Sequence, residues 1–128
     1  MKTIIFLILS LFLTTLSASR TRQTCVQSYT NSYTLDVFNT TSVLLSGEGD
    51  RFEAIRIPFG FTFCNQPSVH VSLGGFDVDV SRNPFFDVSA ENVDTTGFTL
   101  VVHGRSDVIL YGVKVNYIAD DIPPRIVA

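Results

Sequence analysis

Residues 109–117 read Ile-Leu-Tyr-Gly-Val-Lys-Val-Asn-Tyr, and this stretch decides the fold because its odd-numbered positions are all apolar or aromatic. A period of two places apolar side chains on one face of a strand and polar ones on the other. The same alternation recurs between residues 57 and 119, most clearly in residues 69–73, 86–90 and 98–102, and turn residues close each segment. Such half-buried strands need a second sheet to cover their apolar faces, so the sequence predicts an all-β antiparallel sandwich.

Less regular elements are expected around this pattern. An edge strand is expected around residues 33–38, after a flexible N-terminal stretch over residues 19–34. A long strand over residues 52–63 is interrupted by Pro58 and Gly60, which implies a bulge or an edge of the sheet. After the leading apolar segment, no stretch has the pattern of a helix.

The N-terminus has the layout of a secretory signal peptide over residues 1–18. A positive charge at Lys2 precedes an apolar run to Leu16, and the small residues Ser17 and Ala18 suit a signal peptidase. The run is too short for a membrane anchor, because spanning a bilayer takes about 20 apolar residues. The sequence therefore predicts a secreted, extracellular protein without membrane insertion.

The chain that follows the signal peptide is long enough for one domain of ordinary size. Residues 19–50 are expected to form an N-terminal segment with the first strand, and residues 51–119 the core of the sandwich. The whole domain is expected to span roughly residues 25–119. Residues 120–128 form a tail that cannot continue a sheet, because its two prolines lack a backbone donor.

Charge and histidine placement exclude several classes of function. The formal net charge is −3 and the basic residues form no cluster, so nucleic-acid binding, which depends on phosphate neutralisation, is not expected. His70 on a polar strand face and His103 at a strand end are predicted to be surface histidines rather than catalytic bases. Asp77 and Asp79 share a strand face but fall short of a calcium site or a glycosidase pair. We therefore predict a non-enzymatic protein without a metal or a cofactor.

The chain has two cysteines, Cys25 and Cys64, which an exported protein exposes to an oxidising compartment. They either pair within the chain, tying the N-terminal segment to the start of the sandwich, or each bonds a neighbouring subunit. The even count favours the intrachain bond. Asn39 begins an Asn-Thr-Thr acceptor for N-glycosylation, which marks a predicted surface loop.

Eight short motifs follow one another between residues 57 and 119. They are Ile57-x-Phe59, Phe63-Cys64, Pro67-x-Val69, Val71-Ser72-Leu73, Phe76-Asp77-Val78-Asp79, Val88 to Phe98, Leu110-Tyr111-Gly112-Val113 and Asn116-Tyr117-Ile118-Ala119. Their order resembles the H-type lectins, the family that includes the snail agglutinins and the C-terminal domain of the discoidins. The strongest piece of the resemblance is the turn from Asn92 to Phe98, with the Val-Ser-Leu strand at the expected distance upstream.

The resemblance implies a six-stranded antiparallel sandwich, assembly into a homotrimer, and recognition of galactose-type sugars, N-acetylgalactosamine in particular. In the turn itself, Gly97 is expected to have a positive φ and Phe98 to plug the core.

Family members hold the sugar with an acid before the first long strand, an arginine after the Asp-Val segment, and a Trp-His pair in the last loop. These positions fall on Glu48 with Asp50 close by, on Phe85, and on Arg105-Ser106, and the chain contains no Trp. Sugar sites combine carboxylates that accept hydroxyl hydrogen bonds with an aromatic face that packs on the ring. Phe85 and Arg105 could thus exchange the roles of ring and cation. The candidate carbohydrate-binding residues are Glu48, Asp50, Phe85, Arg105, Ser106 and Asp107.

These observations predict a secreted lectin whose partners are glycans or glycoproteins, with cell adhesion as one use. Several sites on one oligomer would raise the avidity of a weak single site. The alternative is a structural or protein-binding sandwich that has lost the sugar site, which the absent Trp and the phenylalanine at position 85 favour. A hydrolase is a third and weaker alternative.

Overall fold

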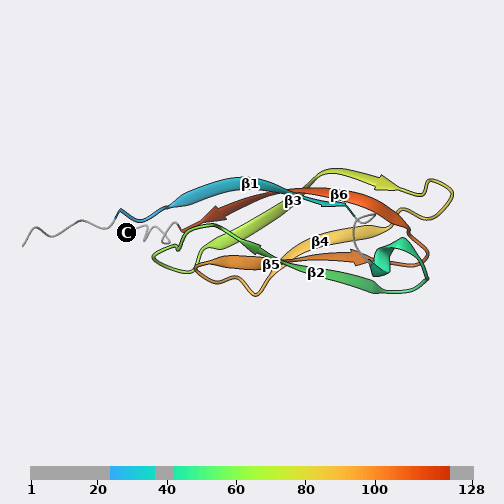
Figure 1. Ribbon diagram of the computed structural model, residues 1–128, viewed down its shortest axis with the longest axis horizontal. Helices are drawn as coiled ribbons and strands as arrows, with labels where there is room; N and C mark the ends of the chain where they lie inside the picture. The colour runs from blue at the N-terminus through green and yellow to red at the C-terminus, as the bar shows by residue number, and fades with distance from the viewer. Residues whose placement is uncertain (1–23, 37–41, 122–128) are drawn as a thin grey trace, which may run out of the picture.

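The computed structural model describes residues 24–36 and 42–121 (Figure 1). The predicted signal peptide over residues 1–18, the acceptor Asn39 and most of the tail lie outside these residues. Six strands and one short 3-10 helix follow in chain order. They are β1 (Ser28–Asp36), η2 (Val43–Leu45), β2 (Arg51–Pro58), β3 (Ser68–Val78), β4 (Phe86–Glu91), β5 (Gly97–Gly104) and β6 (Leu110–Asp120).

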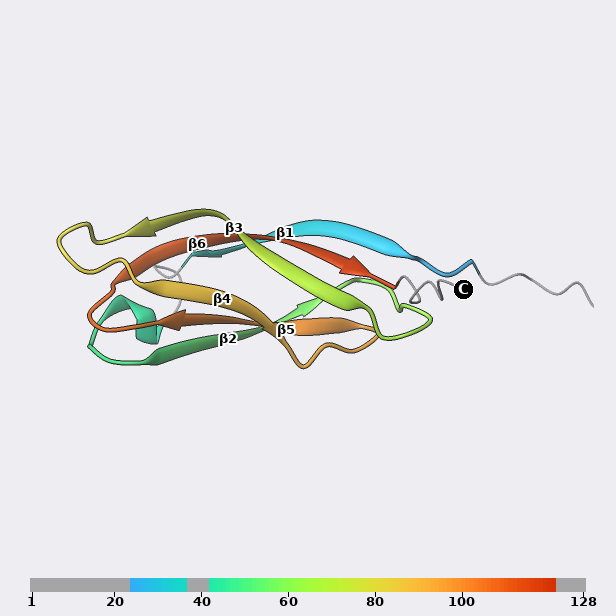
Figure 2. The same ribbon diagram turned by 180° about the vertical axis from the view of Figure 1, so that it is seen from behind.

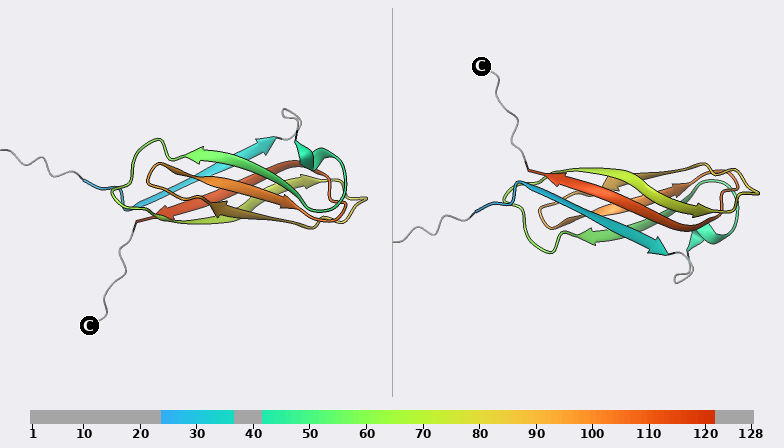
Figure 3. Two further views of the ribbon diagram at one scale, coloured as in Figure 1. Left: turned by 90° about the horizontal axis from the view of Figure 1, so that it is seen from below. Right: turned by 90° about the horizontal axis from the view of Figure 1, so that it is seen from above.

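The strands form two stacked antiparallel sheets with the orders β1-β6-β3 and β2-β5-β4. Figure 1 and the reverse view in Figure 2 show the two layers along the long axis of the molecule. Figure 3 shows one sheet from below and the other from above. The structure confirms the predicted six-stranded antiparallel sandwich. In the described part of the chain, no helix has the length and apolar character needed to cross a bilayer.

The core lies between the sheets and uses the predicted alternation. Phe98, Leu100 and Val102 of β5 face Val113 and Val115 of β6, and all five are almost completely buried. β5 and β6 are the middle strands of their sheets, so their inward side chains are covered from both sides. Burial of an aliphatic or aromatic side chain contributes about 1.5–3 kcal/mol, which makes this layer the main source of stability.

Several element boundaries differ from the sequence-based expectation. β1 begins at Ser28 rather than near residue 33, because β6 offers an antiparallel partner along the whole stretch from Asp120 to Gly112. The second strand ends at Pro58, whose ring cannot continue a ladder, instead of running on to residue 63. Val43–Leu45 forms a 3-10 turn in which the Ser42 hydroxyl accepts a hydrogen bond from the amide of Leu44.

Cys25 and Cys64 form a disulfide within the chain, with their Cα atoms 5.7 Å apart, which confirms the intrachain alternative. The bond ties the segment before β1 to the connection between β2 and β3. Beside it, Phe59 packs edge-on against Phe63 and Tyr29 against Phe61, with ring centroids 5.1 and 5.0 Å apart. This end of the sandwich is therefore closed by a covalent bond and an aromatic cluster.

The turn from Asn92 to Phe98 is built around a carboxylate. Asp94 accepts hydrogen bonds from the Thr96 amide and hydroxyl, both at 2.7 Å, and from the Gly97 amide at 3.0 Å. Phe98 is fully buried, as expected. The expectation of a positive φ at Gly97 is wrong, since Gly47, Gly49 and Gly60 are the described glycines with positive φ. Gly97 is required for another reason, because a Cβ there would overlap the Ile57 carbonyl oxygen of the neighbouring strand.

Candidate functional site

The six predicted site residues lie on three loops at the end of the sandwich opposite the disulfide. Glu48 and Asp50 lie between η2 and β2, Phe85 precedes β4, and Arg105 to Asp107 join β5 to β6. In Figure 1 the three loops meet where η2 is drawn. The structure therefore brings together residues that are nearly 60 positions apart in the sequence.

Backbone hydrogen bonds hold the three loops to one another. The Gly49 amide donates to the Ser106 carbonyl at 2.7 Å, and the Arg105 amide donates to the Phe85 carbonyl at 3.0 Å. The Asn83 amide donates to the Asp107 carboxylate at 3.3 Å. Because each bond joins two different loops, the position of each loop depends on the others.

Local sequence explains the shape of these loops. Gly47 and Gly49 have φ values of 91° and 82°, a region that glycine adopts without steric cost. Ser106 has a φ of 56°, which is uncommon for a residue with a side chain. Arg51, which sequence reasoning missed, donates to the carbonyls of Ser46 at 2.7 Å and of Val108, so it joins two of the loops from beneath.

Phe85 and Arg105 are neighbours in the structure. The guanidinium carbon of Arg105 lies 5.4 Å from the centre of the Phe85 ring, within the range of a cation–π contact. Arg105 Nε also donates to Asp87 Oδ2 at 3.0 Å. Phe85 remains 55% exposed, so much of the ring is open to solvent. An aromatic face and a cation that keeps further donors thus occupy one patch.

His103 was predicted to lie on the surface, and this prediction is wrong. The residue is only 8% exposed. It lies on the outward face of β5, the middle strand of its sheet, directly between Phe52 of β2 and Asp87 of β4. The Phe52 ring stacks on the imidazole with centroids 4.1 Å apart and an interplanar angle of 15°. Cross-strand register, which the sequence does not reveal, decides this burial.

Two carboxylates flank the His103 imidazole. Asp50 Oδ1 lies 3.4 Å from Nε2, and Asp87 Oδ2 lies 3.5 Å from Nδ1. Asp87 therefore contacts both His103 and Arg105. Asp50, on the loop between η2 and β2, contacts His103 of β5 and so connects that loop to the sheet. Like Arg51, the residues Asp87, His103 and Phe52 belong to this end of the molecule and were not selected by sequence reasoning.

The other predicted residues have simpler surroundings. Glu48 and Ser106 are exposed, while Asp107 is half-buried and uses its carboxylate to hold the β3–β4 connection. Among the described residues, no group of three or more His, Cys, Asp or Glu side chains could hold a metal ion. The arrangement offers hydrogen-bond acceptors, one guanidinium and exposed rings, which is chemistry for binding a neutral polar ligand.

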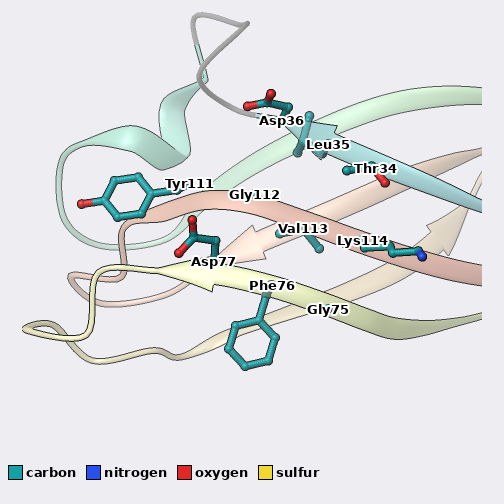
Figure 4. A pocket seen from close by; sticks show the side chains of 10 residues that line it. All are labelled: Thr34, Leu35, Asp36, Gly75, Phe76, Asp77, Tyr111, Gly112, Val113 and Lys114. Atoms are coloured by element: carbon teal, nitrogen blue, oxygen red, sulfur yellow. The ribbon is translucent and has the colours of Figure 1, made fainter.

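A hollow of about 330 Å³ lies on the outer face of the other sheet (Figure 4). Gly112 of β6 forms its floor, and its register partners Asp36 of β1 and Asp77 of β3 flank it. The hollow is lined by Thr34, Leu35, Asp36, Gly75, Phe76, Asp77, Tyr111, Gly112, Val113 and Lys114. None of the six predicted residues contributes to it.

Asp79 does not share this hollow with Asp77, although the two were expected to lie on one strand face. β3 ends at Val78, and the Asp79 carboxylate accepts hydrogen bonds from the Ser81 hydroxyl at 2.6 Å and the Ser81 amide at 2.9 Å. These two hydrogen bonds lower the pKa of the Asp79 carboxyl below its ordinary value, and the bond from the Ser81 hydroxyl has the larger effect. Asp79 therefore caps the turn after β3.

Comparison with known proteins identifies a family whose model matches this chain and relatives that it resembles. A family model described as the H-type lectin domain matches residues 54–119. A curated protein of Fuscovulum blasticum, described as ATP synthase subunits region ORF 7, is 30% identical over 74 residues, which cover 58% of this chain and 64% of that protein. The chain thus matches somewhat less than two thirds of this relative.

Two solved structures of discoidin II from Dictyostelium discoideum share the fold. The recombinant protein superposes with a TM-score of 0.62 at 21% identity, over 72% of this chain and 35% of the discoidin chain. The wild-type protein superposes with a TM-score of 0.62 at 20% identity, over 77% and 38% of the two chains. The chain spans little more than a third of the length of these structures, and at such identities they show the fold alone.

Proposed function

This chain belongs to the H-type lectin domain family, and from that premise we propose that it is a secreted lectin for galactose- or N-acetylgalactosamine-type sugars. The family supports a carbohydrate-binding role, and family and fold together point to a protein that is not an enzyme. In the proposal, the sugar binds at the three loops that carry Glu48, Asp50, Phe85 and Arg105 to Asp107.

One observation carries the proposed location of the site. Phe85 and Arg105 adjoin each other, and hydrogen bonds connect their loops to the loop of Glu48 and Asp50. Carboxylates accept hydrogen bonds from sugar hydroxyls, a guanidinium donates to ring and hydroxyl oxygens, and an exposed ring covers the C–H face of a sugar. The expected exchange of roles between Phe85 and Arg105 is compatible with this arrangement.

A second candidate function is a structural or protein-binding module. It is favoured by the contacts of Arg105, whose guanidinium already donates to Asp87 and stacks on Phe85, as a purely structural clamp would. Under this alternative the loop end would keep its shape and bind no sugar. The two functions therefore predict different sugar binding but the same stability of the protein.

Binding and stability of variants separate the two functions. The secreted protein is first applied to a glycan array, and its affinity for an array-positive sugar is then measured by calorimetry. We expect Glu48→Ala to weaken binding by roughly 1–3 kcal/mol, the cost of leaving polar partners unpaired. Because Glu48 is exposed, the melting temperature of the Glu48→Ala variant should match that of the parent. Arg105→Lys, which keeps the charge but not the planar fork, should also weaken binding.

Asp77→Asn provides the matched control, since it changes a carboxylate in the hollow on the other sheet. It should bind as the parent does. A parent that binds nothing on a broad array would support the structural module. Loss of binding in Asp77→Asn with full binding in Glu48→Ala would move the site to the hollow over Gly112.

Multivalency is part of the proposal. Phe52, Phe76 and Phe85 are more than half exposed, and symmetric oligomers commonly cover such side chains. Three weak sites on one particle would raise avidity by orders of magnitude without a new contact. Light scattering should give a mass near that of three chains, and a stable monomer at micromolar concentration would remove the avidity argument.

Secretion completes the proposal. The Cys25–Cys64 bond is of a kind that persists in oxidising compartments. Protein from the culture medium should begin at or within a few residues of Ser19 when its N-terminus is sequenced. Retention of Met1 in a membrane fraction would contradict an extracellular location.

A further inference from the structure

The His103 imidazole lies in an unusual position for a buried side chain. Both of its nitrogens face carboxylate oxygens, Asp50 at 3.4 Å and Asp87 at 3.5 Å. The Phe52 ring covers one of its faces. In the part of the chain that the structure describes, Nε2 is buried and lacks a hydrogen-bond partner. A buried polar atom of this kind calls for a physical explanation.

Ion pairing of a protonated ring with both carboxylates provides one. A neutral imidazole carries a single N–H, so in either tautomer the other nitrogen presents a lone pair to a carboxylate. The repulsion would push Asp50 or Asp87 away from the ring. An imidazolium carries a proton on each nitrogen and its charge attracts both carboxylates at once. The separations of 3.4 and 3.5 Å are longer than ordinary hydrogen bonds but within ion-pair distance, and a carboxylate on each side matches the charged form better than either neutral tautomer.

A further charged group that contacts this cluster acts in the same direction. Arg105, on the β5–β6 loop, donates to the same Asp87 oxygen that faces His103. Phe52 on β2 adds no charge. With a neutral imidazole, the two carboxylates face one guanidinium and the cluster carries a net negative charge. With an imidazolium, the two positive charges of the cluster balance its two carboxylates.

We propose that His103 is a positioning residue of the sugar site, whose imidazolium holds Asp50 on one loop and, through Asp87, Arg105 on another. This inference rests on the proposed function. Asp50 keeps its second carboxylate oxygen for a sugar hydroxyl while His103 holds the first. Loss of the proton releases Asp50 and loosens the support of Arg105. Sugar affinity therefore rises as pH falls.

The test measures the affinity of the intact protein for N-acetylgalactosamine by calorimetry at pH 5.5, 6.5, 7.5 and 8.5. Affinity should increase at least about fivefold from the highest to the lowest pH, the lower end of ordinary coupling between sites. His103→Gln keeps one N–H donor and cannot be protonated, so its affinity should vary little with pH. His70→Gln is the matched control, because His70 is the other histidine of the chain and is exposed on the other sheet. It should keep the pH profile of the parent.

Asp87→Asn gives a second measurement if His103→Gln folds poorly. With a neutral amide beside Nδ1, the pH profile should become flatter while His103 remains in place. A parent whose affinity is constant over this pH range, or a His103→Gln variant that retains the full profile, would overturn the inference and leave the lectin function standing. A parent that binds no sugar at any of the four pH values would overturn both.

Discussion

Replacement of Gly97 by alanine should destabilise this domain strongly, although it adds a single methyl group. An added Cβ would overlap the carbonyl oxygen of Ile57 and lie 3.0 Å from the Cα atom of Pro58. Both obstacles are backbone atoms of β2, and Pro58 is the register partner of Gly97. Rotation of a side chain cannot relieve this overlap, so β2 and β5 must separate where they pair.

The expected magnitude follows from this geometry. Overpacking in a well-packed interior costs about 1–3 kcal/mol. Because the clash is with backbone, we expect a loss of about 2–3 kcal/mol, the upper part of that range. For a domain of this size each 1 kcal/mol lowers the melting temperature by about 4–8 °C, so the variant should melt roughly 8–24 °C below the parent.

Gly112→Ala is the matched control for this experiment. A Cβ at Gly112 would lie 3.5 Å from the Leu35 carbonyl oxygen, an ordinary contact. Without strain, the change from glycine to alanine is neutral or stabilises by about 0.4–1 kcal/mol, because the unfolded chain becomes less flexible. Urea and thermal unfolding followed by far-UV circular dichroism measure both variants. If the free energies of unfolding of the two variants agree within about 0.5 kcal/mol, the contact with β2 does not matter and our reasoning is refuted.

Two further predictions concern stability. The Thr96 hydroxyl, the Thr96 amide and Arg56 hold the pKa of the Asp94 carboxyl well below its ordinary 3.8, so its contribution is present above about pH 4 and is lost as pH falls further. Asp94→Asn should therefore unfold with a shallower acid dependence than the parent. The Cys25–Cys64 bond spans 39 residues, so replacing both cysteines by serine should lower the free energy of unfolding by about 4 kcal/mol in urea titrations. Covalent dimers of the parent on non-reducing gels would contradict the intrachain bond.

The candidate site was only partly accessible to sequence reasoning. Glu48, Phe85 and Arg105 were selected by the family resemblance, and the structure places their loops together, although their role in sugar binding is still a prediction. Asp87 and Phe52 carry no signal of their own, because each becomes significant only as a cross-strand neighbour of His103. The burial of His103 could have been suspected only from the combined register of β2, β5 and β4.

The sequence by itself determined the class of fold, because a period of two is a local property that each strand displays without reference to the others. Even the wrongly placed ends of β1 and β2 left that conclusion intact. Only the tertiary structure decided which residues meet across the sheets, since register depends on the pairing of strands that are far apart in the chain. It also showed that Gly97 serves close packing against Ile57 rather than a left-handed turn, and that His103 lies between two carboxylates. Distances between such residues arise from packing, and no local pattern encodes them.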